Sequence, residues 1–186
     1  MAAAMRGVVT RGVALTLAEV GAEVGLSAAT VVQRFGTKRE LMRRVIELRR
    51  QRVLAVDFRG EGEPINRIIN GLSGLTEWME TAEHVANVSA VLHTDVADPE
   101  FRELVSAGYR DQRMMIAATL DEAIAEGHIK PCDTGVVARL MQLTMLGAQQ
   151  SWAIEPCGEL ADWVAHCLWA CIDPLLISDE DLAPQV

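Results

Sequence analysis

The apolar positions of this chain recur at the three- and four-residue spacing of amphipathic helices, with glycines, prolines and capping residues between the helical stretches. The pattern predicts about nine helices. Their expected bounds are 2–11, 17–24, 28–35, 38–57, 64–80, 83–96, 99–127, 134–153 and 158–172. Half of the 186 residues are apolar but only 4% are aromatic, which suits helical packing better than sheets. The sequence therefore predicts an all-α fold.

Two short helices are expected on either side of Gly25. This glycine ends the helix over 17–24, because a left-handed backbone costs glycine little. Ser27 is suited to cap the next helix, over 28–35, because its hydroxyl accepts hydrogen bonds from amides of the first turn. Two helices joined by about three residues around a glycine have the sequence form of a helix-turn-helix.

Two capping boxes frame this unit. Thr16 and Glu19 have the spacing of a capping box at the start of the first of the two helices. Thr37 and Glu40 repeat that spacing at the start of the helix over 38–57. Capping residues thus mark the starts of three consecutive predicted helices, those over 17–24, 28–35 and 38–57.

The helix over 28–35 has one face for the core and another for a partner. Val31 and Phe35 lie four residues apart, so they share a face that we assign to the core. A second surface is left for Ala28, Ala29, Thr30, Val32, Gln33 and Arg34. Their small and polar side chains suit base edges and phosphates, the valine suits a thymine methyl group, and a helix about 10 Å wide fits the major groove. Lys38 and Arg39 follow in the first turn of the next helix, a position that favours phosphate.

The distribution of charge changes what the net charge of −9 implies. Residues 1–52 carry ten Lys or Arg and four Glu, a net charge of +6. Residues 53–186 carry seven basic and 22 acidic residues, a net charge of −15. The basic N-terminal segment can attract DNA while the acidic remainder of the chain repels it. The charge distribution is therefore compatible with a nucleic-acid partner.

Residues 16–41, TLAEVGAEVGLSAATVVQRFGTKREL, resemble the DNA-binding motif of the TetR family of bacterial transcription repressors. Upstream, residues 3–12 are similar to the end of the family's first helix. Downstream, residues 98–102 are similar to the start of its long central helix, and residues 123–130 to the end of that helix.

The resemblance implies two domains and a function. Residues 1–46 would form a three-helix DNA-binding domain whose recognition helix covers about 28–35, and residues 47–186 a helical effector-binding and dimerisation domain. The implied function is that of a ligand-responsive, dimeric regulator of transcription, a repressor that a small molecule releases from a palindromic operator. No enzymatic activity and no cofactor are implied.

The resemblance also implies the DNA contacts. Mapped through the motif, the family's contacting positions fall on Ala28, Ala29, Thr30, Val32, Gln33, Arg34 and Lys38. Phosphate contacts are also expected from three capping hydroxyls, those of Thr16, Ser27 and Thr37.

The chain departs from the family's pattern in two places. An aromatic residue is usual where Val32 stands, and the first helix has only 11 residues before Gly12. The short helix suggests the hypothesis that the natural start lies upstream of Met1. It also leaves an alternative open, a helical ligand- or protein-binding dimer that has lost DNA binding.

The last two predicted helices are apolar on more than one face, which indicates burial on two sides. The resemblance implies that they pair with their two-fold mates in a four-helix interface. Function points the same way, because one short helix reads few bases whereas a dimer reads two half-sites about 34 Å apart, or a multiple of that. The expected interface residues are Val137, Leu140, Leu160, Trp163, Val164, Cys167 and Leu168.

A pocket for a small-molecule effector of unknown identity is implied among the helices of 64–153. Its expected lining is made of Met, Trp and His side chains, which suit a loose apolar pocket with a polar group to orient a ligand. The candidates are Trp78, Met79, His93, Met114, Met115, Met141, Met145 and Trp152. Ordinary core packing is the simpler reading of most of these residues.

Other kinds of site find little support in the sequence. The four cysteines show no CxxC spacing, so we expect no metal site, although Cys167, Cys171 and His166 share one stretch. An enzyme would have to use Asp162, His166 and Cys167, but successive residues on a helix point about 100° apart. We therefore expect no catalytic residues.

The sequence holds no signal for export or membrane insertion that we recognise. Residues 1–12 lack the apolar run of a signal peptide, and the longest uncharged run, 140–154, is shorter than the roughly 20 residues that a membrane span needs. A cytoplasmic protein is expected.

Overall fold

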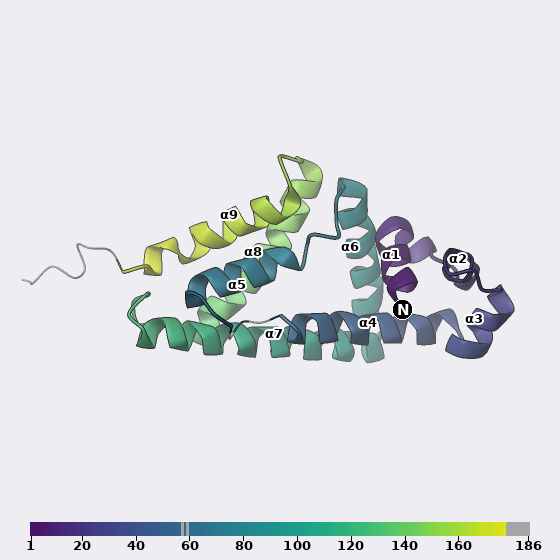
Figure 1. Cartoon of the computed structure of the whole chain (residues 1–186), viewed down its shortest axis with the longest axis horizontal. Helices are drawn as coiled ribbons and strands as arrows, with labels where there is room; N and C mark the ends of the chain where they lie inside the picture. The colour runs from purple at the N-terminus through teal and green to yellow at the C-terminus, as the bar shows by residue number, and fades with distance from the viewer. Residues whose placement is uncertain (57, 59, 178–186) are drawn as a thin grey trace, which may run out of the picture. The chain divides into compact units, whose positions relative to one another are not determined.

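The computed structural model of the protein describes residues 1–56, 58 and 60–177, and these form an all-helical fold. The described residues contain nine α-helices, two short 3₁₀ helices and no strand, only an isolated bridge between Ile129 and Leu176. The α-helices are α1 (Ala2–Arg11), α2 (Leu17–Glu23), α3 (Ala28–Phe35), α4 (Lys38–Leu54), α5 (Pro64–Gly74), α6 (Ala82–Ala97), α7 (Pro99–Ala125), α8 (Thr134–Ile154) and α9 (Leu160–Ile172) (Figure 1). The predicted all-α class is confirmed.

The predicted helix starts agree with the structure within two residues, but two predicted ends are wrong. The helix expected to reach residue 57 ends at Leu54, and the one expected to reach residue 80 ends at Gly74. Beyond α5, both the amide and the hydroxyl of Thr76 donate to the carbonyl of Ser73, at 2.9 and 2.6 Å. These bonds close a turn in place of the next helical hydrogen bonds.

The first of two compact units comprises residues 1–55 and 79–109. It holds α1 to α4, α6 and the beginning of α7, and α1 packs against α6 (Figure 1). Ala4 and Val8 of α1 are fully buried in this packing. Asn87 of α6 donates from its side-chain amide to the carbonyl of Val9 at 2.9 Å, which fixes the end of α1. The helix α1, against which α2 packs, is therefore supported by a helix that is distant in sequence.

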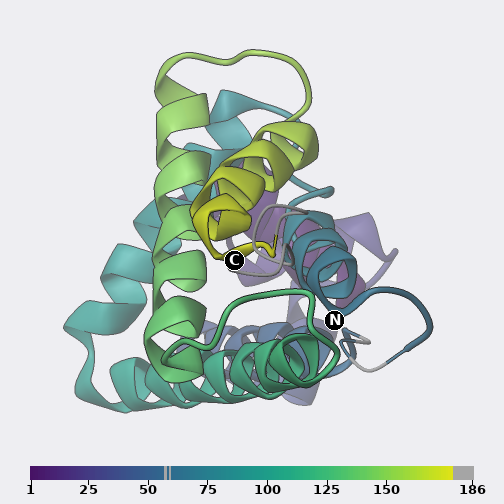
Figure 2. The ribbon, with the colours of Figure 1, turned by 90° about the vertical axis from the view of Figure 1, so that its left-hand side faces the viewer.

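The second unit comprises residues 56–78 and the chain from residue 110 onward. Here α9 packs against α5 and α8, and a short loop joins α8 to α9 (Figure 2). The inner face of α9 is fully or nearly fully buried in the single chain, at Leu160, Val164, Leu168 and Ile172. The core of this unit thus uses one face of α9.

Two further features bear on function. Of the described α-helices, only α7 has residues in both units, since the division falls after Tyr109. Within the described part of the chain, no helix combines the length and the apolar character needed to cross a bilayer.

Candidate DNA-binding site

The turn between α2 and α3 has the close geometry of a helix-turn-helix. Gly25 adopts a left-handed backbone with φ of 68°, as the sequence predicts. The amide of Leu26 donates to the carbonyl of Gly21 at 2.8 Å, which draws the chain back onto α2. A Cβ atom on Gly21 would lie 2.7 Å from the Leu26 carbonyl oxygen and 2.9 Å from a methyl group of Val31. The two helices therefore approach so closely that only glycine fits at position 21 without a shift.

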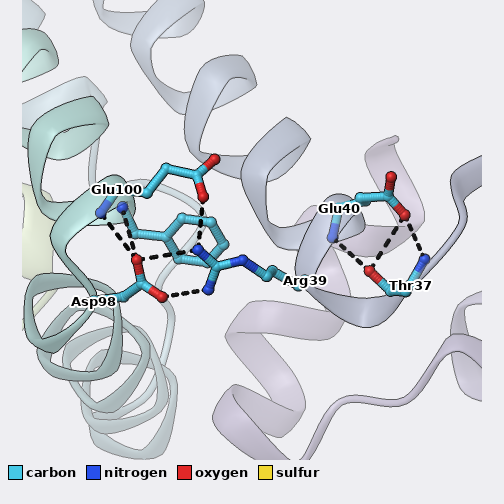
Figure 3. A network of polar contacts seen from close by, with 6 residues as sticks. Thr37, Arg39, Glu40, Asp98 and Glu100 are labelled. Carbon is cyan, nitrogen blue, oxygen red and sulfur yellow. Dashed lines mark hydrogen bonds and ion pairs between the residues drawn. The ribbon is translucent and has the colours of Figure 1, made fainter.

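Both predicted capping boxes are present. Thr16 Oγ1 accepts from the amide of Glu19 at 3.2 Å, and the Glu19 carboxylate accepts from the amide of Thr16 at 2.9 Å. Thr37 and Glu40 make the same pair of bonds, at 3.2 and 2.7 Å (Figure 3). These bonds hold the pKa of both carboxyl groups below the usual value.

The capping hydroxyls are engaged within the chain. Thr16 and Thr37 each donate a hydroxyl proton to the glutamate of their own box. Ser27 Oγ accepts from the amide of Thr30 at 3.1 Å and lies 2.9 Å from the Thr30 hydroxyl. The expected phosphate contacts of these three hydroxyls stay predictions, and the structure shows that each hydroxyl already serves a helix start.

The two faces of α3 separate as predicted. Val31 is 1% exposed, whereas its neighbour Val32 is 49% exposed. Phe35 is partly buried. The exposed side of α3 presents Ala28, Ala29, Thr30, Val32, Gln33 and Arg34. The structure thus leaves six of the predicted contact residues exposed to solvent.

Cations gather at the end of α3. The guanidinium groups of Arg34 and Arg44 both lie over the ring of Phe35, at 5.5 and 5.4 Å from its centroid. Such stacking places both charges beside the last turn of the helix. Lys38, also a predicted contact, is exposed and donates from Nζ to the carbonyl of Val13 at 2.6 Å.

Arg39 is occupied by partners that the sequence pattern does not reveal. Its guanidinium donates to the carboxylates of Asp98 and Glu100, at the start of α7 (Figure 3). The residues lie 59 and 61 positions apart in the chain, so no local spacing predicts the pairing. The hydrogen bond of Asn87 with Val9 could not be predicted from local spacing either, because the two residues lie 78 positions apart.

The expected dimer residues divide into two groups in the structure. Val137, Leu160, Val164 and Leu168 are buried within the single chain, whereas Leu140 is exposed and Trp163 and Cys167 are partly exposed. Burial in the chain's own core leaves no surface on Val164 or Leu168 for a partner, because both are fully covered. The periodic pattern could not separate the inner face of α9 from its outer face.

The expected pocket residues also divide. Met141, Met145 and Trp152 are buried together on α8, and Met115 of α7 and Trp78 are partly buried. Met79 is buried and His93 is exposed, and both belong to the first unit. Met114 is 65% exposed. The buried candidates on α8 are thus the ones that the second unit encloses.

The side chains weighed for catalysis or metal binding all lie on α9. Asp162 and His166 are exposed on α9, and the imidazole of His166 stacks on the ring of Trp163. No group of three or more His, Cys, Asp or Glu side chains within the described residues has the geometry to hold a metal ion.

Comparisons with known proteins agree with this geometry. Residues 1–45 match the family model described as "Bacterial regulatory proteins, tetR family". No curated protein sequence matches the chain significantly.

Solved structures of regulators share the fold over nearly the whole chain. A TetR-family transcriptional regulator from Agrobacterium tumefaciens is 19% identical, with a TM-score of 0.73 over 95% of this chain and 97% of that one. A transcriptional regulator from Saccharomonospora viridis in complex with choline is 19% identical, with a TM-score of 0.74 and 95% of both chains covered. SmeT, the repressor of the Stenotrophomonas maltophilia multidrug efflux pump SmeDEF, is 19% identical, with a TM-score of 0.63 over 100% of this chain and 92% of that one. Two of these proteins are described as transcriptional regulators and the third as a repressor. The family model therefore confirms the resemblance to the TetR family for residues 1–45, and the whole chain shares the fold of the solved regulators.

Proposed function

We propose that the protein represses transcription by binding a palindromic operator as a homodimer, and that a small molecule releases it. The observation that carries the proposal is the exposed side of α3. Val31 anchors this helix in the core, and the neighbouring positions present Thr30, Val32, Gln33 and Arg34 to solvent. This set combines hydrogen-bonding groups for base edges, a methyl-bearing side chain for thymine and a guanidinium for guanine or phosphate.

The residues divide into base-reading and phosphate-binding roles. Gln33 and Arg34 are assigned to base edges, because both are exposed on a helix that fits the major groove and both carry groups that form hydrogen bonds with base edges. Lys38 is assigned to phosphate, because it stands in the first turn of α4, where free amides and the helix dipole favour an anion. In the free protein its ammonium group is held by the Val13 carbonyl, so DNA binding exchanges one acceptor for another.

Dimerisation is assigned to the outer face of α8, with help from α9. Val136, Leu140 and Leu143 follow one another at helical spacing and are 53%, 49% and 57% exposed. Apolar side chains that recur on one helix face need a partner surface, and a two-fold partner offers the same face in return. This interface keeps Leu140, Trp163 and Cys167 of the expected residues. The four that are buried within the chain, Val137, Leu160, Val164 and Leu168, are replaced by residues that remain accessible.

Effector binding is assigned to the second unit, where Met141, Met145 and Trp152 are buried. The related regulator from Saccharomonospora viridis was solved with choline, which supports a small-molecule ligand for this fold. Because α7 has residues in both units, a shift of this helix on effector binding would reach the unit that contains α3. Coupling between two such sites typically amounts to about 1–3 kcal/mol.

The test is a binding selection from random duplex DNA, followed by titration of the recovered sequence with variants. Gln33→Ala and Arg34→Ala are each expected to lose about 1–3 kcal/mol at one base position, whereas Lys38→Ala weakens all sequences alike. Arg102→Ala, which removes an exposed arginine from α7, is the matched control and leaves the affinity unchanged. Uniform loss from all three head variants would contradict the base-reading assignment. Failure to enrich any sequence would favour the dimer that has lost DNA binding.

A further inference from the structure

Arg39 joins the first turn of α4 to the start of α7. Its Nη1 atom donates to Asp98 Oδ2, and its Nη2 atom donates to Asp98 Oδ1 at 3.2 Å and to Glu100 Oε2 at 2.6 Å (Figure 3). The guanidinium also lies over the ring of Phe101, 4.6 Å from its centroid. One side chain thus makes three charge-assisted hydrogen bonds and one aromatic contact on a single helix start. We call Arg39, Asp98, Glu100 and Phe101 the arginine clamp.

The α7 end of the arginine clamp is fixed by other bonds. Asp98 Oδ1 accepts from the amides of Glu100 and Phe101, at 3.0 and 3.3 Å, so the carboxylate caps α7 while it holds Arg39. Phe101 is buried. The pKa of Asp98 is lowered to about 2, first by its hydrogen bond with Arg39, so this carboxyl is ionised at neutral pH. The Asp98 carboxylate is therefore charged and held by two backbone amides, next to the buried ring of Phe101.

The α4 end of the arginine clamp lies close to the recognition helix. Arg39 is the second residue of α4 and follows the last residue of α3, Phe35, by four positions. Between them stand Gly36, with φ of 74°, and the Thr37 cap. The amide of Gly36 donates to the carbonyl of Val32 at 2.7 Å, and Thr37 is held by its capping box with Glu40, so hydrogen bonds fix this short connection at both ends. A constraint on Arg39 is consequently a constraint on the C-terminal end of α3.

We propose that Arg39 is a positioning residue for DNA binding, which holds the end of α3 in place through the arginine clamp and does not itself bind phosphate. The inference rests on the proposed function and goes beyond it, since the arginine acts through α7 and not through DNA. Two carboxylates and an aromatic ring already occupy the guanidinium, and a phosphate would have to displace them. Lys38, one position earlier, is held only by a neutral carbonyl and is the cation available to DNA.

The two roles predict opposite effects of Glu100→Gln on the affinity for DNA. If Arg39 bound phosphate, Glu100→Gln would free the arginine and remove a negative charge near DNA, so binding would tighten. If Arg39 positions α3, Glu100→Gln weakens the clamp, so binding weakens although the protein has become more positive. Glu100→Gln leaves the Asp98 cap of α7 intact, because that cap uses backbone amides.

The salt dependence of binding separates the roles a second time. Each phosphate neutralised by a cation contributes about 0.9 to the slope of log K against log salt. We expect Arg39→Gln to raise the Kd for the selected operator about threefold to tenfold with the slope unchanged. Lys38→Gln removes one phosphate contact from each of the two subunits, so it is expected to lower the slope by about 1.8. Arg102 is an exposed arginine on α7, and Arg102→Gln is the control for the loss of one positive charge. It is expected to change neither the Kd nor the salt slope.

The experiment measures operator binding at four salt concentrations for the Arg39→Gln, Glu100→Gln and doubly substituted proteins. In the double variant the losses do not add, because both substitutions break the same contact. The charge-reversed pair Arg39→Glu with Glu100→Arg binds DNA more tightly than Arg39→Glu alone, because the new arginine offers a partner to the new carboxylate; a general destabilisation of the DNA-binding unit would not show this recovery. Thermal unfolding of each variant checks that the fold is retained at the temperature of the binding measurement.

The outcomes are distinct. Tighter binding by Glu100→Gln, or a slope lowered by about 1.8 in Arg39→Gln, would show a phosphate contact in each subunit and overturn the positioning role. Unchanged affinity in Arg39→Gln would also overturn it, while leaving the proposed function in place. If the unmodified protein enriches no DNA sequence, the proposed function fails, and the positioning role fails with it.

Discussion

Two neighbouring valines of α3 provide the sharpest test of which side of this helix faces DNA. Val31→Ala removes two buried methyl groups, at about 0.8 kcal/mol each for lost burial, and leaves a cavity that raises the total to about 2 kcal/mol. Val32→Ala removes the same atoms from a half-exposed position, so the expected loss of stability is no more than about 0.5 kcal/mol. For DNA the order reverses, because only Val32 is placed to meet a thymine methyl group. Losing that contact is worth about 1 kcal/mol, roughly a fivefold rise in Kd.

The assay pairs urea unfolding with operator titration for the two variants, made in the same background. The expected result is a lowered unfolding midpoint for Val31→Ala with an unchanged slope, and a weakened operator complex for Val32→Ala with an unchanged midpoint. Equal destabilisation by both substitutions would refute the assignment, since it would mean that α3 is rotated about its axis relative to the described packing.

Three further predictions concern the same unit. Gly21→Ala is expected to destabilise the protein by about 1–3 kcal/mol in thermal unfolding, because the new Cβ atom meets the Leu26 carbonyl; no loss would show that the turn adjusts freely. Thr37→Ala removes the cap that pairs with Glu40 and is expected to cost about 1 kcal/mol, whereas Thr37→Ser retains most of it. Asp95 is 3% exposed, and burial raises its pKa from 3.8 to about 6. The folded protein therefore binds this proton more tightly than the unfolded chain does, and the free energy of unfolding falls as pH rises through about 6. Relative to the unmodified protein, Asp95→Asn is expected to gain stability by about 2–3 kcal/mol between pH 4 and pH 7.5 in urea unfolding, and parallel pH profiles would contradict this.

The parts of the fold that the sequence predicts are those set by interactions a few residues long. The Thr16 and Thr37 boxes and the left-handed Gly25 each depend on partners within four positions, so their spacing alone indicates where α2, α3 and α4 begin. The alternation of Val31 and Val32 between core and surface follows from helical periodicity in the same way.

The parts that the sequence does not predict depend on helices that meet from distant positions. The clamp between Arg39 and Asp98 joins residues 59 positions apart, and nothing near Arg39 distinguishes it from the exposed arginines of α4. On α9 both faces are apolar, so the pattern shows that two sides pack but not which side meets α5 and α8 within the chain. Val164 was therefore expected at a subunit interface although it belongs to the core of the single chain.

The measurement that tests the central claim most directly is the selection of bound sequences from random duplex DNA at moderate salt, with Arg34→Ala selected in parallel. The account predicts a palindrome whose half-sites lie about one helical turn apart, or a multiple of it, and relaxed preference at one symmetric pair of bases in the variant. Recovery of no common sequence, or of the same palindrome with undiminished preference from the variant, would contradict the claim that the exposed side of α3 reads DNA.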